Sequence, residues 1–144
     1  MRLPEALYRP GGLVREISLL NEEVLASGTG TGVTAFLTNT NINYAWILTN
    51  LSLVATPAGA EFVNRMRFRL FTPLVDAVPL DYFIKADETD GAAAAIRSID
   101  WQGEILLLPG WGVKGEANKS AGVSNMDLDF AVLGYQFPAG NFVR

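Results

Sequence analysis

Hydrophobic and polar side chains alternate along much of this chain, most clearly between Phe62 and Phe71. One set of alternate positions there, beginning at Phe62, is largely apolar, includes Met66 and Phe68, and is expected to face the core. The other set carries three basic side chains, those of Arg65, Arg67 and Arg69. Because successive side chains of a strand point to opposite faces, a period of two over about ten residues predicts a β-strand.

The segment from Tyr44 to Ala55 is apolar at both sets of alternate positions. A strand that is apolar on both faces is typical of one that lies between two packed surfaces. Trp46 belongs to this segment and is expected in the core.

Shorter apolar runs, separated by glycine, proline and asparagine, predict the remaining strands. They cover residues 33–38, 80–85, 92–98, 104–108, 113–117 and 126–137, with 13–20 and 22–26 as two short strands or one bent strand. Turns are expected at 100–103 and 109–112. Strands that recur about every 8 to 15 residues, without a convincing amphipathic helix, predict an all-β protein. The mostly long connections favour a single-domain, jelly-roll-like β-sandwich over residues 13–144.

Residues 1–12 are predicted to form an extended N-terminal arm. Pro4 and Pro10 disfavour a stable helix there. The arm carries three apolar side chains that are candidate anchors on a partner: Leu3, Leu7 and Tyr8. A segment of this kind either frays or lies along a neighbouring chain.

The amino-acid composition excludes several classes of catalytic and binding function. Cysteine and histidine are both absent, which excludes disulfides, thiolate nucleophiles and every histidine-containing catalytic triad. The net charge of −4 disfavours binding of a nucleic-acid backbone over a broad surface. No apolar run approaches the ~18 residues of a membrane span, and residues 1–12 lack the apolar core of a secretory signal. We therefore expect neither a nucleic acid nor a membrane as a partner.

Charged residues make up only 18% of the chain, against about 25% in ordinary globular proteins. A small protein has a high surface-to-volume ratio, so a shortage of charge indicates that another chain covers part of the surface. The alternative is a monomer whose surface is polar but uncharged. Self-association is the favoured interpretation.

The acidic residues do not form a recognisable catalytic or metal-binding motif. No pair of carboxylates has the arrangement of a general acid and a nucleophile, so no catalytic residue is assigned and no enzyme is expected. Asp87–Gly91 resembles the start of a calcium loop, but Arg97 stands where the closing glutamate is needed. Asp127 and Asp129 share one strand face, which could be a cation site or an exposed surface. We expect no metal and no cofactor.

Candidate partner-binding residues are the three arginines and Trp111. Arg65, Arg67 and Arg69 form a basic row suited to carboxylates of a partner or a neighbouring subunit. A solvated face, or pairs with acids of the same chain, is the competing interpretation. Trp111 follows Pro109-Gly110 and is expected to be buried or at an interface, with stacking on a sugar as the alternative.

Several turn and strand segments carry a family resemblance. They are Trp46–Leu53, Thr56–Gly59, Asp100–Trp111, Gly134-Tyr135 and Pro138–Asn141. Together they resemble small virion proteins of tailed bacteriophages, of the head-decoration (cement) type, over about two-thirds of the chain. The resemblance implies a jelly roll, commonly a homotrimer, that clamps subunits of the major capsid protein. It also implies a position on the capsid surface after assembly in the host cytoplasm, and no catalytic residue.

The favoured function is therefore a non-enzymatic capsid decoration protein. The alternative is a carbohydrate- or receptor-binding β-sandwich of a phage tail or head fibre, with Trp111 at the sugar site.

Overall fold

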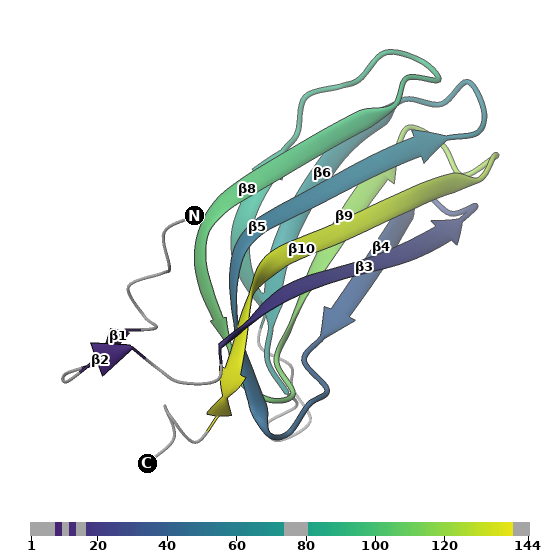
Figure 1. Cartoon of the computed structure of the whole chain (residues 1–144). Helices are drawn as coiled ribbons and strands as arrows, with labels where there is room; N and C mark the ends of the chain where they lie inside the picture. Colours follow the sequence, from purple (N-terminus) through teal and green to yellow (C-terminus); the bar gives the residue numbers. More distant parts are fainter. Residues whose placement is uncertain (1–7, 10–11, 14–16, 74–80, 140–144) are drawn as a thin grey trace.

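The computed structural model describes residues 8–9, 12–13, 17–73 and 81–139. These residues form ten β-strands, and none of them belongs to an α-helix (Figure 1). The strands are β1 (Tyr8–Arg9), β2 (Gly12–Leu13), β3 (Ser18–Gly28), β4 (Gly32–Thr38), β5 (Tyr44–Pro57), β6 (Val63–Phe71), β7 (Asp81–Asp87), β8 (Arg97–Leu107), β9 (Gly112–Lys119) and β10 (Met126–Pro138).

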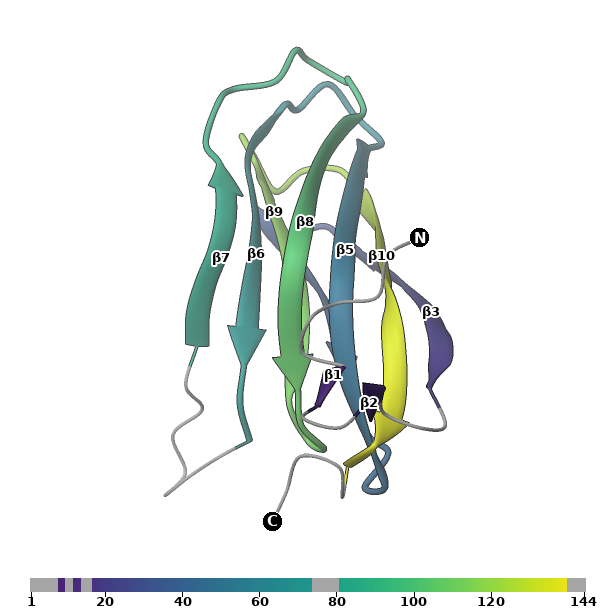
Figure 2. The same cartoon turned by 60° about the vertical axis from the view of Figure 1, so that its left-hand side comes forward.

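Eight of these strands form two four-stranded antiparallel sheets, in the orders β3-β10-β5-β8 and β4-β9-β6-β7. Strand β3 pairs with β10, β4 with β9, β5 with β8 and β6 with β7, so the chain behaves as one long hairpin rolled into two layers. Figure 2 shows β8, β5, β10 and β3 side by side in the front sheet. This nested pairing defines a jelly roll and confirms the predicted all-β sandwich.

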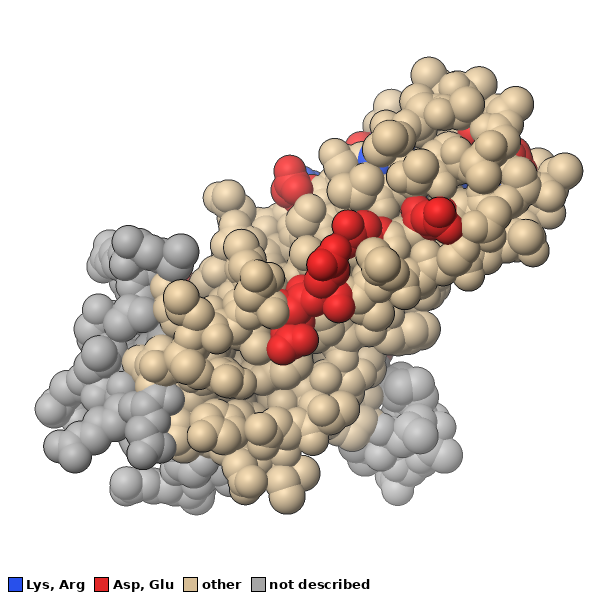
Figure 3. All heavy atoms as spheres, turned by 45° about the vertical axis from the view of Figure 1, so that its right-hand side comes forward, with Lys and Arg blue, Asp and Glu red and all other residues tan. Residues whose placement is uncertain are grey.

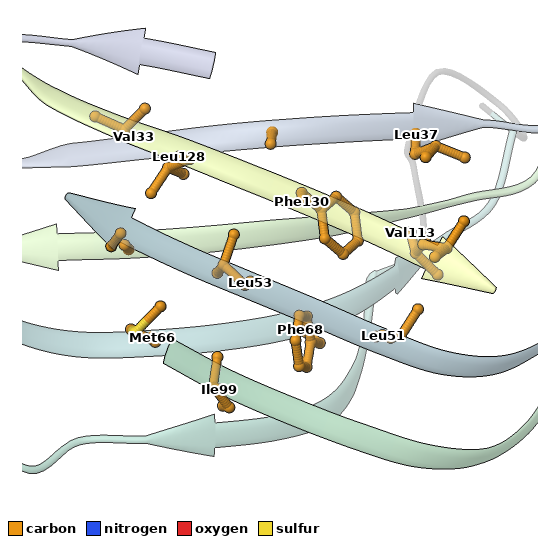
Figure 4. Close-up of a cluster of buried hydrophobic side chains, with 14 of the residues drawn as sticks. Val33, Leu37, Leu51, Leu53, Met66, Phe68, Ile99, Val113, Leu128 and Phe130 are labelled. Atoms are coloured by element: carbon orange, nitrogen blue, oxygen red, sulfur yellow. The ribbon is translucent and has the colours of Figure 1, made fainter. Parts of the chain in front are cut away.

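The main core lies between the two sheets (Figure 4). Phe68 of β6 and Phe130 of β10 stack at its centre with ring centroids 5.9 Å apart, and neither is exposed. Met66 and Leu53 are also fully buried in this cluster. Burying one such side chain contributes about 1.5–3 kcal/mol, so the contact between the inner faces holds the layers together. Trp46 is 7% exposed and belongs to this core, as predicted.

An irregularity in β5 explains why both of its faces are apolar. Its register shifts between Leu48 and Asn50 against β8, and Gly134 marks a shift on β10. Before the shift, Leu48 faces the main core, while Ile47 faces a second buried cluster that includes Tyr135. Packing on both faces is therefore confirmed for the first part of the strand. Beyond it, the outward residues Asn50, Ser52 and Val54 are half-buried.

Strand β6 differs from its predicted inner face at one end. Met66 and Phe68 are buried as expected, but Phe62 is not, and Val63 takes the core position. The register of β6 against β9 shifts between Val63 and Arg65, which adds one residue to β6 and reverses the alternation there.

Two predictions around β8 are wrong. Residues 92–96 lie outside any strand, where Ala94 has a positive φ of 57° and the Gly91 N–H donates to the Val63 carbonyl. Residues 100–103, expected to turn, lie inside β8. Asp100 and Gln102 point outward from a paired strand, opposite Ser52 and Asn50, so the cross-strand ladder overrides their turn propensity.

Polar side chains tie the loops at one end of the sandwich. Lys119 is buried, and its ammonium group donates to the Ser124 carbonyl and lies 3.6 Å from a Glu61 carboxylate oxygen. Glu61 accepts hydrogen bonds from the Ser124 hydroxyl and, at 2.8 Å, from its backbone N–H. These bonds, with the charge of Lys119, lower the pKa of Glu61 to about 2. The carboxylate must therefore stay ionised to hold the loop.

Replacing Gly134 by alanine should destabilise the fold by roughly 1–3 kcal/mol, the usual cost of overpacking. A Cβ at this position would overlap the Ile47 carbonyl oxygen and lie 2.9 Å from the Cα of Leu48, both on backbone that cannot move aside alone. The control is Gly30→Ala, where the nearest atom would be 3.7 Å away. Urea unfolding measures both variants, and equal stabilities would contradict the role given to Gly134.

Acid should destabilise the protein in part through Glu61. A carboxyl whose pKa falls from 4.5 to about 2 on folding stabilises the native state above pH 4.5, and this contribution disappears as the pH falls toward 2. Between those values the unfolding free energy of Glu61→Gln should fall less steeply than that of the unmodified protein. Urea titrations followed by tryptophan fluorescence test this, with Glu22→Gln on exposed β3 as control. Parallel pH profiles would refute it.

Candidate functional site

The outer surface of sheet β4-β9-β6-β7 gathers basic and aromatic side chains. Cross-strand pairing sets Phe36, Lys114, Arg69 and Phe83 in one row across all four strands. We call this surface the basic face and define it by eight residues: Phe36, Arg65, Arg67, Arg69, Asp81, Phe83, Lys114 and Glu116. Four of them are basic and two acidic, so the face has a net charge of +2.

The arginines differ in their partners. Arg67 forms an ion pair with Glu116, whose carboxylate also lies 3.5 Å from the Lys114 ammonium group. Arg65 donates to the side-chain oxygen of Asn118, at 3.1 and 3.3 Å. The Nε atom of Arg69 is buried and has no acceptor among the described residues. Among the described acids, one thus pairs with one of the three arginines.

Aromatic rings lie among these charges. The Phe36 ring packs edge-to-face on Phe71, with centroids 5.8 Å apart, and the Lys114 ammonium group lies 5.8 Å from the Phe36 centroid. Phe36 remains 56% exposed and Phe83 69% exposed. Large apolar side chains that stay exposed beside cations are a feature of protein-binding surfaces.

The outer surface of the other sheet is acidic. Four acids from three strands lie on it near one another: Glu23, Asp100, Asp127 and Asp129. Strands β3, β5, β8 and β10 contain a single basic residue, Arg97, whose guanidinium reaches across to the Val63 carbonyl of the other sheet. Figure 3 shows acidic side chains in an oblique band with very little basic surface near them. We call these four acids, together with the exposed Leu25 and Leu133 on the same surface, the acidic face.

Two acids of the acidic face, Glu23 and Asp129, lie side by side and repel each other. Glu23 lies opposite Ala131, beside Asp129 on the neighbouring strand. The contact with the Asp129 carboxyl and its negative charge raise the pKa of Glu23. Asp127 has neutral partners instead, accepting from the Ser27 hydroxyl at 2.7 Å and the Asn125 amide at 2.8 Å. A shallow hollow of about 480 Å³ lies beside Leu25, Asp127 and Asp129.

Trp111 lies half-buried against the main core rather than standing free at a loop tip. Its carbonyl accepts a hydrogen bond from the N–H of Asn39, and its own N–H donates to the Leu108 carbonyl. Asn39 is fully buried and binds the carbonyls of Tyr44 and Leu107 through its amide. The loop that carries Trp111 is thereby fixed to the adjacent loop.

The predicted arm is only partly described. Leu3 and Leu7 lie outside the described residues, as does the side chain of Tyr8. The backbone of Tyr8 belongs to β1, which pairs with β2. Binding by these residues, and by the arginines and Trp111, stays a prediction. The structure brings the three arginines onto one face and sets Trp111 apart from them.

Sequence reasoning missed most residues of the two faces. Phe36, Phe83 and Lys114 belong to strands other than that of the arginines, and no spacing along the chain links them. Their exposure is visible in the alternation of β4 and β7, but their alignment in one row depends on the register. The acidic face is likewise assembled from distant segments, of which only the Asp127/Asp129 pair is local.

A polar hollow of about 450 Å³ lies at the end of the sandwich, lined by Thr31, Asn64, Arg65, Glu88, Asp90, Asn118 and Lys119. Nearby, Asp87 accepts hydrogen bonds from the side chain and backbone of Thr89 and pairs with Arg97 at 2.7 Å, which lowers the pKa of Asp87 to about 2. Among the described residues, no three acids are grouped as a metal site would need, and no helix is long and apolar enough to cross a membrane.

No family model and no curated protein sequence matches the chain. Its shape is similar to several solved structures. In infectious bursal disease virus, Gx strain, the match has 13% identity and a TM-score of 0.46, and covers 91% of this chain and 34% of that one. This chain therefore spans about a third of that viral protein.

Two further similarities cover most of both chains. A virus-like particle of the extra small virus of the prawn Macrobrachium rosenbergii matches with 10% identity, 90% and 86% coverage and a TM-score of 0.41. A family 22 carbohydrate-binding module of Clostridium thermocellum Xyn10B matches with 12% identity, 99% and 100% coverage and a TM-score of 0.43. At such identities the likeness concerns the arrangement of strands alone.

Proposed function

We propose that this chain is a non-enzymatic structural protein of a virion, specifically a capsid decoration (cement) protein. It would form a homotrimer on the capsid surface and bind adjacent subunits of the particle, including the major capsid protein, through its basic face. The observation that carries the proposal is the net charge of +2 on a sheet face that also exposes Phe36 and Phe83. Such a surface fits carboxylates and apolar side chains of a neighbouring subunit.

The build of the sandwich supports a connecting role. The four strands of sheet β3-β10-β5-β8 are 11 to 14 residues long. Arg97 binds the Val63 carbonyl at one edge, and Lys85 binds the Asp100 carbonyl between β7 and β8 at 2.7 Å. A connector that binds several subunits at once also multiplies weak contacts into firm attachment.

The basic face can be tested with Arg65→Glu combined with Arg69→Glu. Arg67 is left unchanged because its replacement would strip Glu116 of its ion pair and endanger the fold. The measurement is the amount of this chain, by quantitative mass spectrometry, on virus particles purified from cells that produce it. We expect at least a tenfold loss, about the effect of reversing charges across an interface, with the trimer preserved in sedimentation.

The matched control is Arg65→Lys combined with Arg69→Lys, which keeps the charge and should keep most of the attachment. If particles carry as much of the Glu variant as of the unmodified chain, the basic face is a solvated surface and not a docking surface. Particles that lack the chain altogether, or a monomer at micromolar concentration, would overturn the structural role itself.

Carbohydrate or receptor binding is the second candidate function. The polar hollow favours it, because the amides of Asn64 and Asn118 and the carboxylate of Asp90 are groups that bind sugar hydroxyls. A glycan array separates the two functions. Decoration alone predicts no reproducible signal, whereas a glycan whose binding is lost in Asn64→Ala would favour the hollow. Loss in Trp111→Ala alone would favour the tryptophan.

A further inference from the structure

The two outer faces of the sandwich are complementary in charge. The four acids of the acidic face give it a charge of −4, and the basic face on the opposite side carries +2. The net charge of the whole chain, −4, conceals this separation. Charge segregated onto opposite faces favours contact between unlike faces of two molecules and opposes contact between like ones.

Apolar side chains accompany the charges on both sides. Leu25 is 72% exposed and Leu133 45% exposed on the acidic face, while Phe36 and Phe83 are the exposed pair on the basic face. Protein interfaces combine an apolar centre with a polar rim, and each face supplies both components.

The repeat distances of the charged rows also agree. Arg65, Arg67 and Arg69 occupy alternate positions of β6, and Asp127 and Asp129 occupy alternate positions of β10. Alternate residues of an antiparallel strand are about 6.8 Å apart, so rows laid over one another stay in step. Each of these strands has a neighbour on both sides within its sheet, so the rows lie away from the sheet edges.

Each face lacks what the other supplies. The buried Arg69 Nε has no acceptor among the described residues. On the acidic face, the Glu23 carboxyl lies beside that of Asp129, and this contact between two acids raises the pKa of Glu23. A carboxylate from another molecule could accept a hydrogen bond from Arg69 Nε, and a guanidinium group could neutralise the repulsion between Glu23 and Asp129.

We propose that the basic face of one copy binds the acidic face of a second copy of this chain, with β6 laid over β10. The inference rests on the proposed function in one respect, namely that the basic face is a docking surface. It adds that the acidic surface bound there belongs to a second copy of this chain. A contact between unlike faces is head-to-tail. The two faces lie on opposite sides of the sandwich, so each copy can bind one neighbour on either side and the copies form a linear assembly. This contact differs from the one that would close a trimer.

The available area suits a reversible contact. A four-stranded face is about 19 Å wide and, over nine residues, about 30 Å long, which is roughly 600 Å² in projection. Standard interfaces bury about 800 Å² on each side, so this contact falls at the weaker end. Association should therefore be dynamic and should depend on ionic strength.

The experiment uses two variants of the full chain. In the acid variant, Glu23→Lys and Asp129→Lys neutralise the acidic face; in the base variant, Arg65→Glu and Arg69→Glu reverse the basic face. Sedimentation velocity follows the concentration-dependent growth of species at about 20 mM and about 500 mM NaCl. Glu22→Lys is the matched control for Glu23→Lys, because Glu22 lies next to it on β3 but faces the opposite way. Circular dichroism checks that all variants fold.

We expect molecules of the unmodified chain to associate head-to-tail into linear assemblies at low salt and to dissociate at high salt. Each double variant alone should associate at least about tenfold more weakly, and Glu22→Lys should not. An equimolar mixture of the two variants should restore association, because the intact acidic face of one meets the intact basic face of the other.

A mixture that does not associate, or linear assemblies that survive in either double variant, would overturn the self-contact. The proposed function has a separate readout. If Arg65→Glu/Arg69→Glu is lost from particles while the mixture fails to associate, the basic face docks on another acidic subunit and only this inference is wrong. If particles do not contain the chain, the virion role fails, whatever the sedimentation result.

Discussion

Eight strands bury their inner side chains between two sheets, and the rest of the molecule depends on this contact. Phe68 stacks on Phe130 at the centre, and Gly115 leaves the space in which Leu53 and the Phe130 ring approach β9. Once these side chains face inward, the period of two forces their neighbours onto the outer surfaces. The arginines of β6 and the aspartates of β10 are exposed for the same reason that Met66 and Leu128 are buried. The charge of the outer faces therefore follows from the geometry of the core.

The polar ties at the borders of the sandwich show how the layers are held without disulfides. Arg97 leaves one sheet to bind the Val63 carbonyl of the other, and the buried Lys119 binds the Ser124 carbonyl and Glu61. Asn39 forms hydrogen bonds with the backbone of five residues at the opposite end. A buried polar group is stable only when its hydrogen bonds are made, so these residues fix loops that would otherwise separate. Hydrogen bonds at both ends of the sandwich therefore hold in place the two sheets that carry the outer faces.

Sequence patterns predicted the fold class because alternation is local. The strand at 62–71 and the doubly apolar segment at 44–55 carry their periodicity within a dozen residues. Register is not local. The extra residue near Asn64 moves Val63 into the core, and the shift at Thr49 exchanges the inner and outer faces of β5. Asp100 to Gly103 have turn propensity, yet pairing with β5 keeps them extended. The row from Phe36 to Phe83 likewise exists only through pairing among four strands, so no pattern in one segment reveals it.

The low charge content of the chain acquires a different meaning once the faces are known. The outer face of one sheet carries a net charge of +2 and the outer face of the other a net negative charge, with large apolar side chains among the charged ones. Each face repels its own kind, and part of its charge has no opposite charge beside it among the described residues. Separation of this sort contributes little to folding, since exposed pairs are worth about 0–1 kcal/mol. In the proposed contact it would act between molecules, by favouring the meeting of unlike faces. The core fixes the shape of the sandwich and thereby the positions of both charged faces, and the proposed contacts are built on those two surfaces.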